Sequence, residues 1–287
     1  YWRGSVVGPV RDLAFSGDGR FLAVGSSRIT LFDYQGTEGW NFSTGAGALV
    51  PSVAFTADGN YIVAGSDNGA VHFFSRRGNL LWQALARGPV TAVDVSRDGS
   101  VVAAGGRDRV LQVYGRAGGL PWAVQTGAPI FALALSADGR FVAIGKEGGD
   151  LEVYRPREGL AWQNRTGSDV LTVDVSRQGE AVAVGTAGGA VYLFSGDGSV
   201  RWSFDAGAPV IAVALSGSGE YLATGAGERA FIFRTAGVPV PATAEATGTP
   251  AGNTIPAATP TQAGGAGALI GIVAGAAAAG GGLYRHR

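Results

Sequence analysis

The sequence of 287 residues contains no cysteine, which excludes disulfide bonds, thiolate metal sites and cysteine catalysis. It also contains no methionine, not even at position 1. The missing initiator suggests that an N-terminal segment such as a secretory signal has been removed. A shortened chain is an equally good explanation. With only two histidines, His72 and His286, there is almost no material for a histidine-rich metal site or a Ser-His-Asp triad.

Net charge is absent as well. The 22 basic and 22 acidic residues balance to a formal charge of zero, so no global field attracts nucleic acid, and we expect no nucleic-acid partner. The sequence has no Walker loop, dinucleotide fingerprint or calcium loop. We therefore expect no enzymatic activity, no cofactor and no small-molecule substrate.

What the chain does have is a repeat of about forty residues. Tryptophan recurs at this interval at Trp2, Trp40, Trp82, Trp122, Trp162 and Trp202. Each tryptophan lies 17 residues, or once 19 residues, before the glycine of a turn. Most of these turns are Asp-Gly, in which glycine adopts a positive φ and aspartate bonds its own backbone. This regularity identifies a repeat protein.

Each unit consists of four short apolar runs. In the fifth unit the runs are 170–176, 181–184, 190–194 and 200–204, and turn residues separate them. The second run of every unit ends in glycine, at Gly25, Gly65, Gly105, Gly145, Gly185 and Gly225, as expected where the backbone leaves a crowded sheet. Four-stranded units at this period predict an all-β fold, namely a β-propeller.

The ends of the repeat array set the expected number of blades. The array opens on a fourth strand around Trp2 and closes on a third strand at 230–233. We therefore expect the two ends to share one blade. This gives a six-bladed β-propeller of four-stranded blades with terminal strand closure, over residues 1–236.

Two stretches carry a resemblance to known repeats. Residues 52–66 resemble the first two strands of a WD repeat, and residues 71–82 resemble the Gly-x-x-x-Trp ending of a quinoprotein propeller repeat. The array lacks the Gly-His and Trp-Asp dipeptides of the first family and the Ala-x-Asp-x-x-Thr-Gly segment of the second, so no site residues are carried over. Proteins with this hybrid repeat are similar to prokaryotic, often archaeal, cell-surface propellers with a C-terminal membrane anchor.

The composition changes after the repeats. Residues 237–265 are rich in Thr, Pro, Ala and Gly, which is typical of a linker or an O-glycosylated stalk. Residues 266–284 are uncharged and precede the basic end 285–287. This pattern predicts a single transmembrane helix with a cytoplasmic C-terminus and an extracellular propeller, and an unstructured Ala-Gly tail is the alternative. Gly267, Gly271 and Gly275 have the spacing with which spanning helices pack on a partner.

Candidate partner-binding residues fall on loops. The loops that follow the second strands and the links between blades share one face of a propeller. On that face the sequence places a mixed set of charges suited to a protein partner: Arg87, Arg107, Asp108, Arg109, Lys146, Glu147, Asp169, Glu228 and Arg229. A solvated loop surface is the alternative interpretation.

Two further pairs of residues stand out. Asp94 and Asp174 occupy a first-strand position at which most other units have alanine. Each carboxylate either lines the axial channel or is buried and satisfied by backbone donors. Asn41 and Asn164 lie in sequons on outer strands and are candidates for glycosylation. Because Asn41 follows its tryptophan by one residue and Asn164 by two, we expect their side chains on opposite faces.

Together these features predict a membrane-anchored extracellular propeller that acts as a non-catalytic protein-interaction, scaffold or structural subunit of a surface or membrane assembly. A second copy of the chain is among the candidate partners. The alternative from another class is a quinoprotein-like or hydrolytic enzyme with a site at the propeller axis, and no residue of the sequence demands it.

Overall fold

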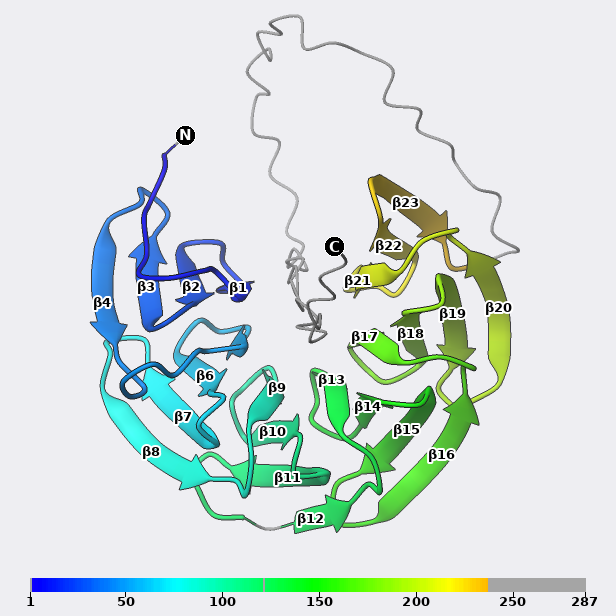
Figure 1. Cartoon of the computed structure of the whole chain (residues 1–287), viewed down its shortest axis with the longest axis horizontal. Coiled ribbons are helices and arrows are strands. Elements are labelled where there is room, and N and C mark those ends of the chain that lie inside the picture. The colour runs from blue at the N-terminus through cyan, green and yellow to red at the C-terminus, as the bar shows by residue number, and fades with distance from the viewer. Residues whose placement is uncertain (1, 121, 237–287) are drawn as a thin grey trace, which may run out of the picture.

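The computed structural model describes residues 2–120 and 122–236. Their strands form six antiparallel sheets, here called blades 1 to 6, which follow one another around an axis (Figure 1). No helix occurs in these residues, so they contain none that is long and apolar enough to cross a membrane. The expected linker, transmembrane helix and cytoplasmic tail, with Gly267, Gly271 and Gly275, lie outside the described residues.

In each blade the first strand is innermost and the last is outermost. Blade 1 contains β1 (Asp12–Phe15), β2 (Phe21–Gly25), β3 (Ile29–Asp33) and β4 (Glu38–Phe42). Blade 2 contains β5 (Ser52–Phe55), β6 (Tyr61–Gly65), β7 (Ala70–Ser75) and β8 (Leu80–Leu85). Blade 3 contains β9 (Val90–Val95), β10 (Val101–Gly106), β11 (Val110–Gly115) and β12 (Trp122–Gln125).

The second half of the array repeats this plan. Blade 4 contains β13 (Ile130–Leu135), β14 (Val142–Lys146), β15 (Asp150–Arg155) and β16 (Gly159–Arg165). Blade 5 contains β17 (Val170–Val175), β18 (Ala181–Thr186), β19 (Ala190–Ser195) and β20 (Val200–Asp205). Blade 6 contains β21 (Val210–Leu215), β22 (Tyr221–Ala226) and β23 (Arg229–Arg234).

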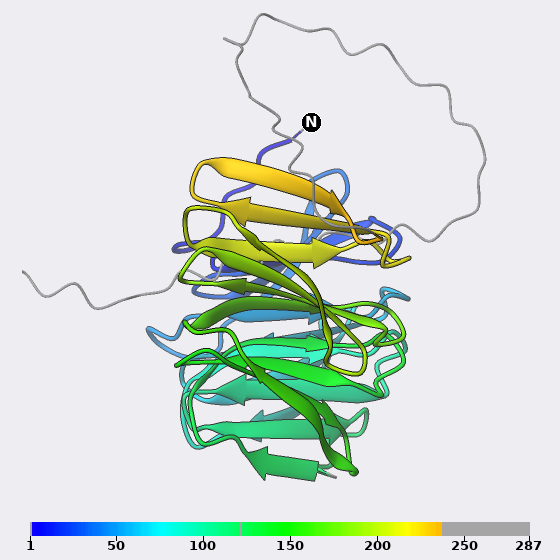
Figure 2. The same cartoon turned by 90° about the vertical axis from the view of Figure 1, so that its right-hand side faces the viewer.

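The apolar pattern of each strand follows from its position in the blade. Strand β7 lies inside its blade and buries five of its six residues, because neighbouring blades cover both of its faces. The outer strand β8 alternates between exposed and half-buried residues, as a strand with one solvated face does. The strands run across the thickness of the ring (Figure 2).

Consecutive blades share one packing contact. The glycine that ends the second strand lies against a valine or isoleucine at the start of the next blade. A Cβ atom on Gly145 would lie 2.2 Å from Val170 Cγ1. The pairs are Gly25 with Val50, Gly65 with Val90, Gly105 with Ile130, Gly145 with Val170 and Gly185 with Val210. The five apolar partners are at most 1% exposed, so these junctions accept only glycine at the strand end.

The repeated tryptophans make a second contact between blades. Trp40 on β4 donates its Nε1–H to the carbonyl of Arg76 in blade 2, at 2.9 Å. The indole ring covers Gly78 in the same turn, where a Cβ atom would lie 2.8 Å from Trp40 Cγ. Trp82 and Trp162 bond the following blade in the same way. Each of these outer strands is thereby tied to the next blade.

The expected terminal strand closure is wrong for this structure. Blade 6 has three strands, and residues 2–11 form no strand. Trp2 packs on blade 1 instead. Its Nε1–H donates to the Tyr34 carbonyl at 3.1 Å, and the centre of its ring lies 5.6 Å from that of Phe32. The N-terminal segment is therefore held against blade 1, and β23 pairs on its outer side with no described strand.

Blades 1 and 6 also lack the valine-on-glycine contact. Val10 has the repeat position of Val50 but is 47% exposed. A Cβ atom on Gly225 would meet only Ala212, at 4.0 Å. An interval separates the two blades (Figure 1). The six blades therefore form an open ring in this structure.

The variant Gly145→Ala is expected to lower the free energy of unfolding by about 1–3 kcal/mol, because its Cβ would overlap Val170 in a packed junction. Gly225→Ala is the matched control, since the same strand position has space there. It should be neutral or stabilise the fold by up to about 1 kcal/mol. Urea unfolding followed by tryptophan fluorescence measures both. Equal losses would mean that blade 6 packs on blade 1 in solution.

Candidate functional site

The two ends of the ring differ in what they carry. The loops after the second strands and the links between blades form one end, here called the loop face. The Asp-Gly turns and the turns before the outer strands form the other, here called the turn face. Six of the nine candidate partner-binding residues are exposed on the loop face: Arg87, Arg107, Arg109, Glu147, Glu228 and Arg229.

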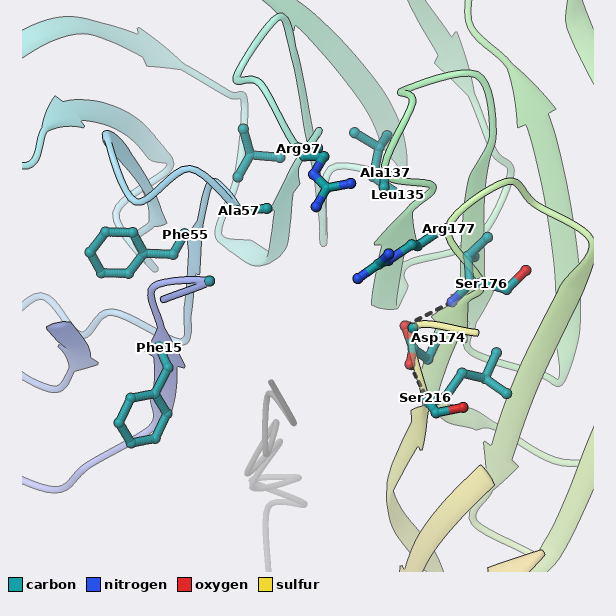
Figure 3. Close-up of a pocket in the computed structure, with 15 residues that line it drawn as sticks. Phe15, Phe55, Ala57, Arg97, Leu135, Ala137, Asp174, Ser176, Arg177 and Ser216 are labelled. Atoms are coloured by element: carbon teal, nitrogen blue, oxygen red, sulfur yellow. Dashed lines mark hydrogen bonds between the residues drawn. The ribbon is translucent and has the colours of Figure 1, made fainter. Parts of the chain in front are cut away.

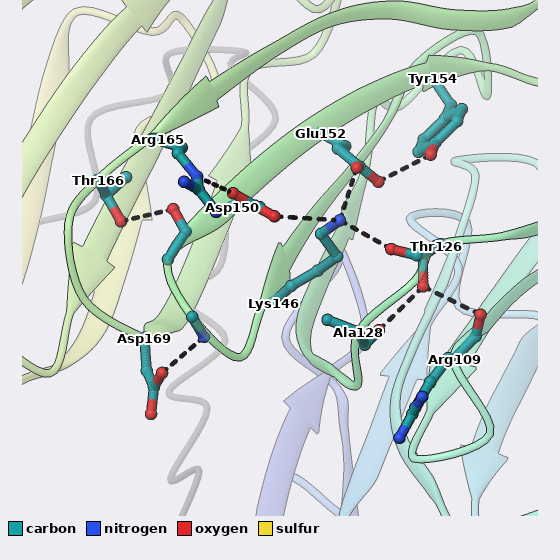
Figure 4. A network of polar contacts seen from close by, with 12 residues as sticks. Arg109, Thr126, Ala128, Lys146, Asp150, Glu152, Tyr154, Arg165, Thr166 and Asp169 are labelled. Carbon is teal, nitrogen blue, oxygen red and sulfur yellow. Dashed lines mark hydrogen bonds and ion pairs between the residues drawn. The ribbon is translucent and has the colours of Figure 1, made fainter.

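The assignment of Lys146 to the binding surface is wrong. Lys146, the only lysine of the chain, is 3% exposed. Its Nζ donates to Glu152 Oε1 at 2.6 Å and to the Thr126 carbonyl at 2.8 Å (Figure 4). Tyr154 donates its hydroxyl to the other Glu152 oxygen at 2.7 Å. Because β14 continues through Lys146, the side chain turns into the blade, where an ion pair is needed to offset burial of its charge.

This buried ion pair supports a loop of the neighbouring blade. Thr126 bonds Lys146 through its carbonyl, and its Oγ1 and backbone N–H both donate to the Arg109 carbonyl, at 3.0 and 2.9 Å. Arg109 has a positive φ of 63°, a conformation that a side chain other than glycine adopts only when the surroundings hold it. The network therefore fixes the backbone of the loop that carries Arg107 and Arg109.

Asp108 and Asp169 are half-buried and hold loops together. Asp108 accepts the backbone N–H of Arg87, at 3.3 Å, through one oxygen and that of Val110, at 3.2 Å, through the other. Asp169 accepts the N–H of Gly148 at 2.8 Å. Each carboxylate joins a link between blades to a loop of the following or preceding blade. Their oxygens serve the local structure, while the arginines around them project outward.

Asp94 and Asp174 both bridge from one first strand to the next blade. Asp94 accepts the N–H of its own neighbour and, through Oδ2, that of Leu135 at 2.7 Å. Asp174 does the same with Leu215 at 2.6 Å. Two backbone donors thus satisfy each carboxylate, and the bridges join blades 3 to 4 and 5 to 6.

A third bridge was missed by the sequence reasoning. Asp12 on β1 accepts the N–H of Val53 in blade 2 at 2.8 Å. It lies two residues before the position of Asp94 in the repeat. The one feature of the sequence that could have indicated this bridge is an isolated aspartate at the start of an apolar strand.

The three bridging carboxyls have raised pKa values. Burial raises the pKa of Asp12 and Asp94 to about 7 and that of Asp174 to about 6, although backbone hydrogen bonds act in the opposite direction. Repulsion from Asp174 and Asp12 adds to the rise at Asp94. A proton is therefore held more tightly by each carboxyl in the folded chain than in the unfolded one.

We expect the stability of the fold to fall as the pH rises from about 4 to about 7, because the unfolded chain has already lost these protons over that range. Urea midpoints at about pH 5 and about pH 8 measure the effect. Asp94→Asn should reduce this pH dependence, at lower absolute stability because an amide offers only one acceptor oxygen. A higher wild-type midpoint at the higher pH would contradict the prediction.

A cavity of about 260 Å³ lies on the axis at the turn face (Figure 3). Asp174 is part of its wall, whereas Asp94 is not. Arg97 and Arg177 also reach into it, and the sequence reasoning did not identify them, because polar residues are common beside turns. Within residues 2–120 and 122–236, no group of three His, Asp or Glu side chains is placed to hold a metal ion.

The two sequons lie in different surroundings. Asn41 on β4 is exposed. Asn164 on β16 is half-buried, and its Nδ2 donates to the Gly198 carbonyl of blade 5 at 2.8 Å. Attachment of a glycan to Asn164 would require this bond to break at a blade junction.

In a host that glycosylates secreted proteins, we expect a glycan on Asn41 and none on Asn164. The Asn41 amide donates only to the exposed side chain of Glu38, at 2.6 Å, whereas the Asn164 amide donates to a backbone carbonyl of the next blade. Mass spectrometry of the intact chain measures the added mass. Asn41→Gln should remove that mass, and Asn164→Gln should leave it. A glycan found on Asn164 alone would refute this assignment.

Profiles of two protein families match the chain. The profile of a PQQ-repeat family described as outer membrane protein assembly factor BamB matches residues 25–180, more than half of the sequence. The profile described as WD domain, G-beta repeat matches residues 3–31. No curated protein matches the chain. The two matches confirm the expected mixture of quinoprotein-like and WD-like propeller repeats.

Proposed function

Because the chain belongs to the PQQ-repeat family described as outer membrane protein assembly factor BamB, we propose that it acts as a protein-binding scaffold. The family description names an assembly factor, and propeller domains with PQQ-like or WD repeats commonly bind proteins. The proposed binding surface is the loop face, where a rigid ring of strands presents exposed charged side chains on short loops.

The proposal of protein binding at the loop face rests mainly on one observation. Arg87, Arg107 and Arg109, here called the arginine cluster, are exposed on two loops that meet at the junction of blades 2 and 3. The Asp108 carboxylate joins the two loops that carry them, and Thr126 holds the Arg109 backbone. Because these bonds form within the free protein, a partner does not have to order the loops when it binds.

The chemistry of the arginine cluster favours a partner with an acidic surface. A guanidinium group offers several donors in a fixed planar arrangement that matches a carboxylate. Complementary charge speeds encounter and sets specificity at a protein interface. Glu147, Glu228 and Arg229 complete a mixed rim around the loop face, which suits the polar rim of a protein–protein contact.

The proposed location is the outer side of a membrane. Strand β23 runs toward the turn face, where the Thr235 backbone N–H donates to the Glu220 carbonyl at 2.8 Å. The Thr- and Pro-rich residues 237–265 would continue from that face to a spanning segment at 266–284 and a cytoplasmic end at 285–287. The loop face would then point away from the membrane and remain accessible to a partner.

The arginine cluster is tested by charge reversal. Arg87→Glu with Arg107→Glu should reduce recovery of the partner in affinity capture from solubilised membranes by about tenfold or more, because two favourable charge pairs become repulsive. Arg109 is left unchanged because of its positive φ. Quantitative mass spectrometry of the captured proteins gives the readout.

The matched control reverses two exposed arginines on the turn face, Arg77 and Arg140. This control variant has the same change in net charge and should capture the partner at the wild-type level. Loss of the partner in the control and retention in the loop-face variant would place binding on the turn face. Equal capture by all three chains would mean that the arginines of the loop face do not contribute to partner binding.

A further inference from the structure

Blade 6 has an outer edge unlike those of the other blades. The third strands of blades 1 to 5 each pair with a fourth strand, whereas the outer side of β23 pairs with no strand of residues 2–120 and 122–236. This edge borders the interval between blades 6 and 1 (Figure 1). A strand with a partner on one side only directs alternate backbone N–H and C=O groups outward, so β23 is a template on which another strand can pair.

The five complete blades show which side chain such a strand would bring. In each of them one third-strand residue pairs with the repeated tryptophan of the fourth strand, and this residue is at most 3% exposed: Leu31, Phe73, Val113, Val153 and Leu193. Its equivalent in blade 6 is Ile232, which pairs with the same second-strand position of its own blade. Ile232 is 63% exposed. The apolar residue that meets a tryptophan elsewhere is therefore uncovered in blade 6.

Two further positions of β23 face the same edge without a partner strand. Ala230 is exposed, whereas its equivalent in blade 5, Val191, is fully buried opposite a phenylalanine of the outer strand. Arg229 is exposed at the start of β23. In blade 4 the equivalent residue, Asp150, pairs across the strands with the oppositely charged Arg165, at 2.8 Å between Oδ1 and Nε. An incoming strand would thus meet an apolar position and then a cationic one.

We propose that the outer edge of β23 binds an extended segment of a partner protein, which pairs antiparallel to it as the fourth strand of blade 6. The segment carries an aromatic residue opposite Ile232, an apolar residue opposite Ala230 and an acidic residue opposite Arg229. Backbone hydrogen bonds provide the pairing, and these three side chains provide the specificity. Residues 200–205, the outer strand of blade 5, have this order of side chains. The edge is a second binding surface, separate from the arginine cluster.

The segments of this chain do not have the required order. Trp2 is followed at the second and third positions by Gly4 and Ser5, which supply neither an apolar side chain nor a negative charge. Trp2 is also held on blade 1 by its bond to the Tyr34 carbonyl. Residues 237–265 contain no aromatic residue. A second copy offers the same segments, and its described outer strands are paired within their own blades. The occupant is therefore a different protein.

A synthetic peptide with the sequence of residues 200–205 tests the proposal. Labelled with fluorescein and added to the full-length chain in non-ionic detergent, it should bind saturably in fluorescence anisotropy, with a Kd on the order of 0.1–1 mM. Alanine in place of its tryptophan should weaken binding by about tenfold or more. At saturation the peptide should slow hydrogen exchange of the amides of residues 229–234, because outward N–H groups become paired. No saturable binding, or binding without protection of β23, would overturn the proposal.

Variants of the chain then locate the site. Ile232→Ser should weaken binding of the peptide by about tenfold, because the contact with its tryptophan is lost. Leu85→Ser is the matched control, since Leu85 is also exposed on an outer strand, and it should bind as the wild type does. Arg87→Glu with Arg107→Glu should also keep wild-type affinity. Arg229→Glu should weaken binding of the peptide and favour an analogue with lysine in place of its aspartate. Wild-type affinity in Ile232→Ser, or loss of binding in the loop-face variant, would refute this site.

Discussion

The contact of a valine or isoleucine with the glycine that ends the preceding blade's second strand determines the geometry of the whole ring. It occurs at each of the five junctions, and the apolar partner is almost completely buried at all of them. Glycine is required there because a Cβ atom would overlap the neighbouring side chain. The spacing of blades around the axis follows from this close approach, and so do the positions of the inner strands.

The polar features depend on that spacing. Asp94 reaches the backbone of Leu135, and Asp174 reaches that of Leu215, only because consecutive first strands lie within hydrogen-bond distance of a short side chain. The same spacing brings the residues around the axial cavity together. On the opposite end, Thr126 links the buried Lys146 to the loop of blade 3. The loop face is therefore built on fixed backbone and needs little reorganisation to bind a partner.

Periodicity in the sequence was enough to predict the blades. The four expected strands of the fifth unit agree with β17 to β20 to within two residues at each end, because alternation and turn residues are local signals. Closure of the ring was not predictable in this way. Whether β23 pairs with the N-terminal segment depends on where Trp2 packs, and that is a tertiary contact without a local pattern.

The direction of side chains at and just after the strand ends was also not predictable from the sequence. Lys146 lies next to Glu147 in a loop sequence, yet one extra residue of strand turns it inward to Glu152. Arg97 and Arg177 precede turns and look like solvated residues in the sequence, although they reach the axial cavity. For Lys146 the register of the strand decides between solvent and interior. Arg97 and Arg177 lie in turns after the first strands, so no strand pattern indicates the direction of their side chains.

Site-specific photocrosslinking tests directly whether the loop face contacts a protein partner. The chain has no cysteine, so a single cysteine can carry a photoreactive maleimide at one chosen place. Ala187 on the loop face and Ser218 on the turn face are suitable positions, the first half-buried and the second exposed. We expect a crosslinked protein adduct from Ala187→Cys in intact membranes and none from Ser218→Cys. Adducts from Ser218→Cys alone, or from neither variant, would contradict this expectation.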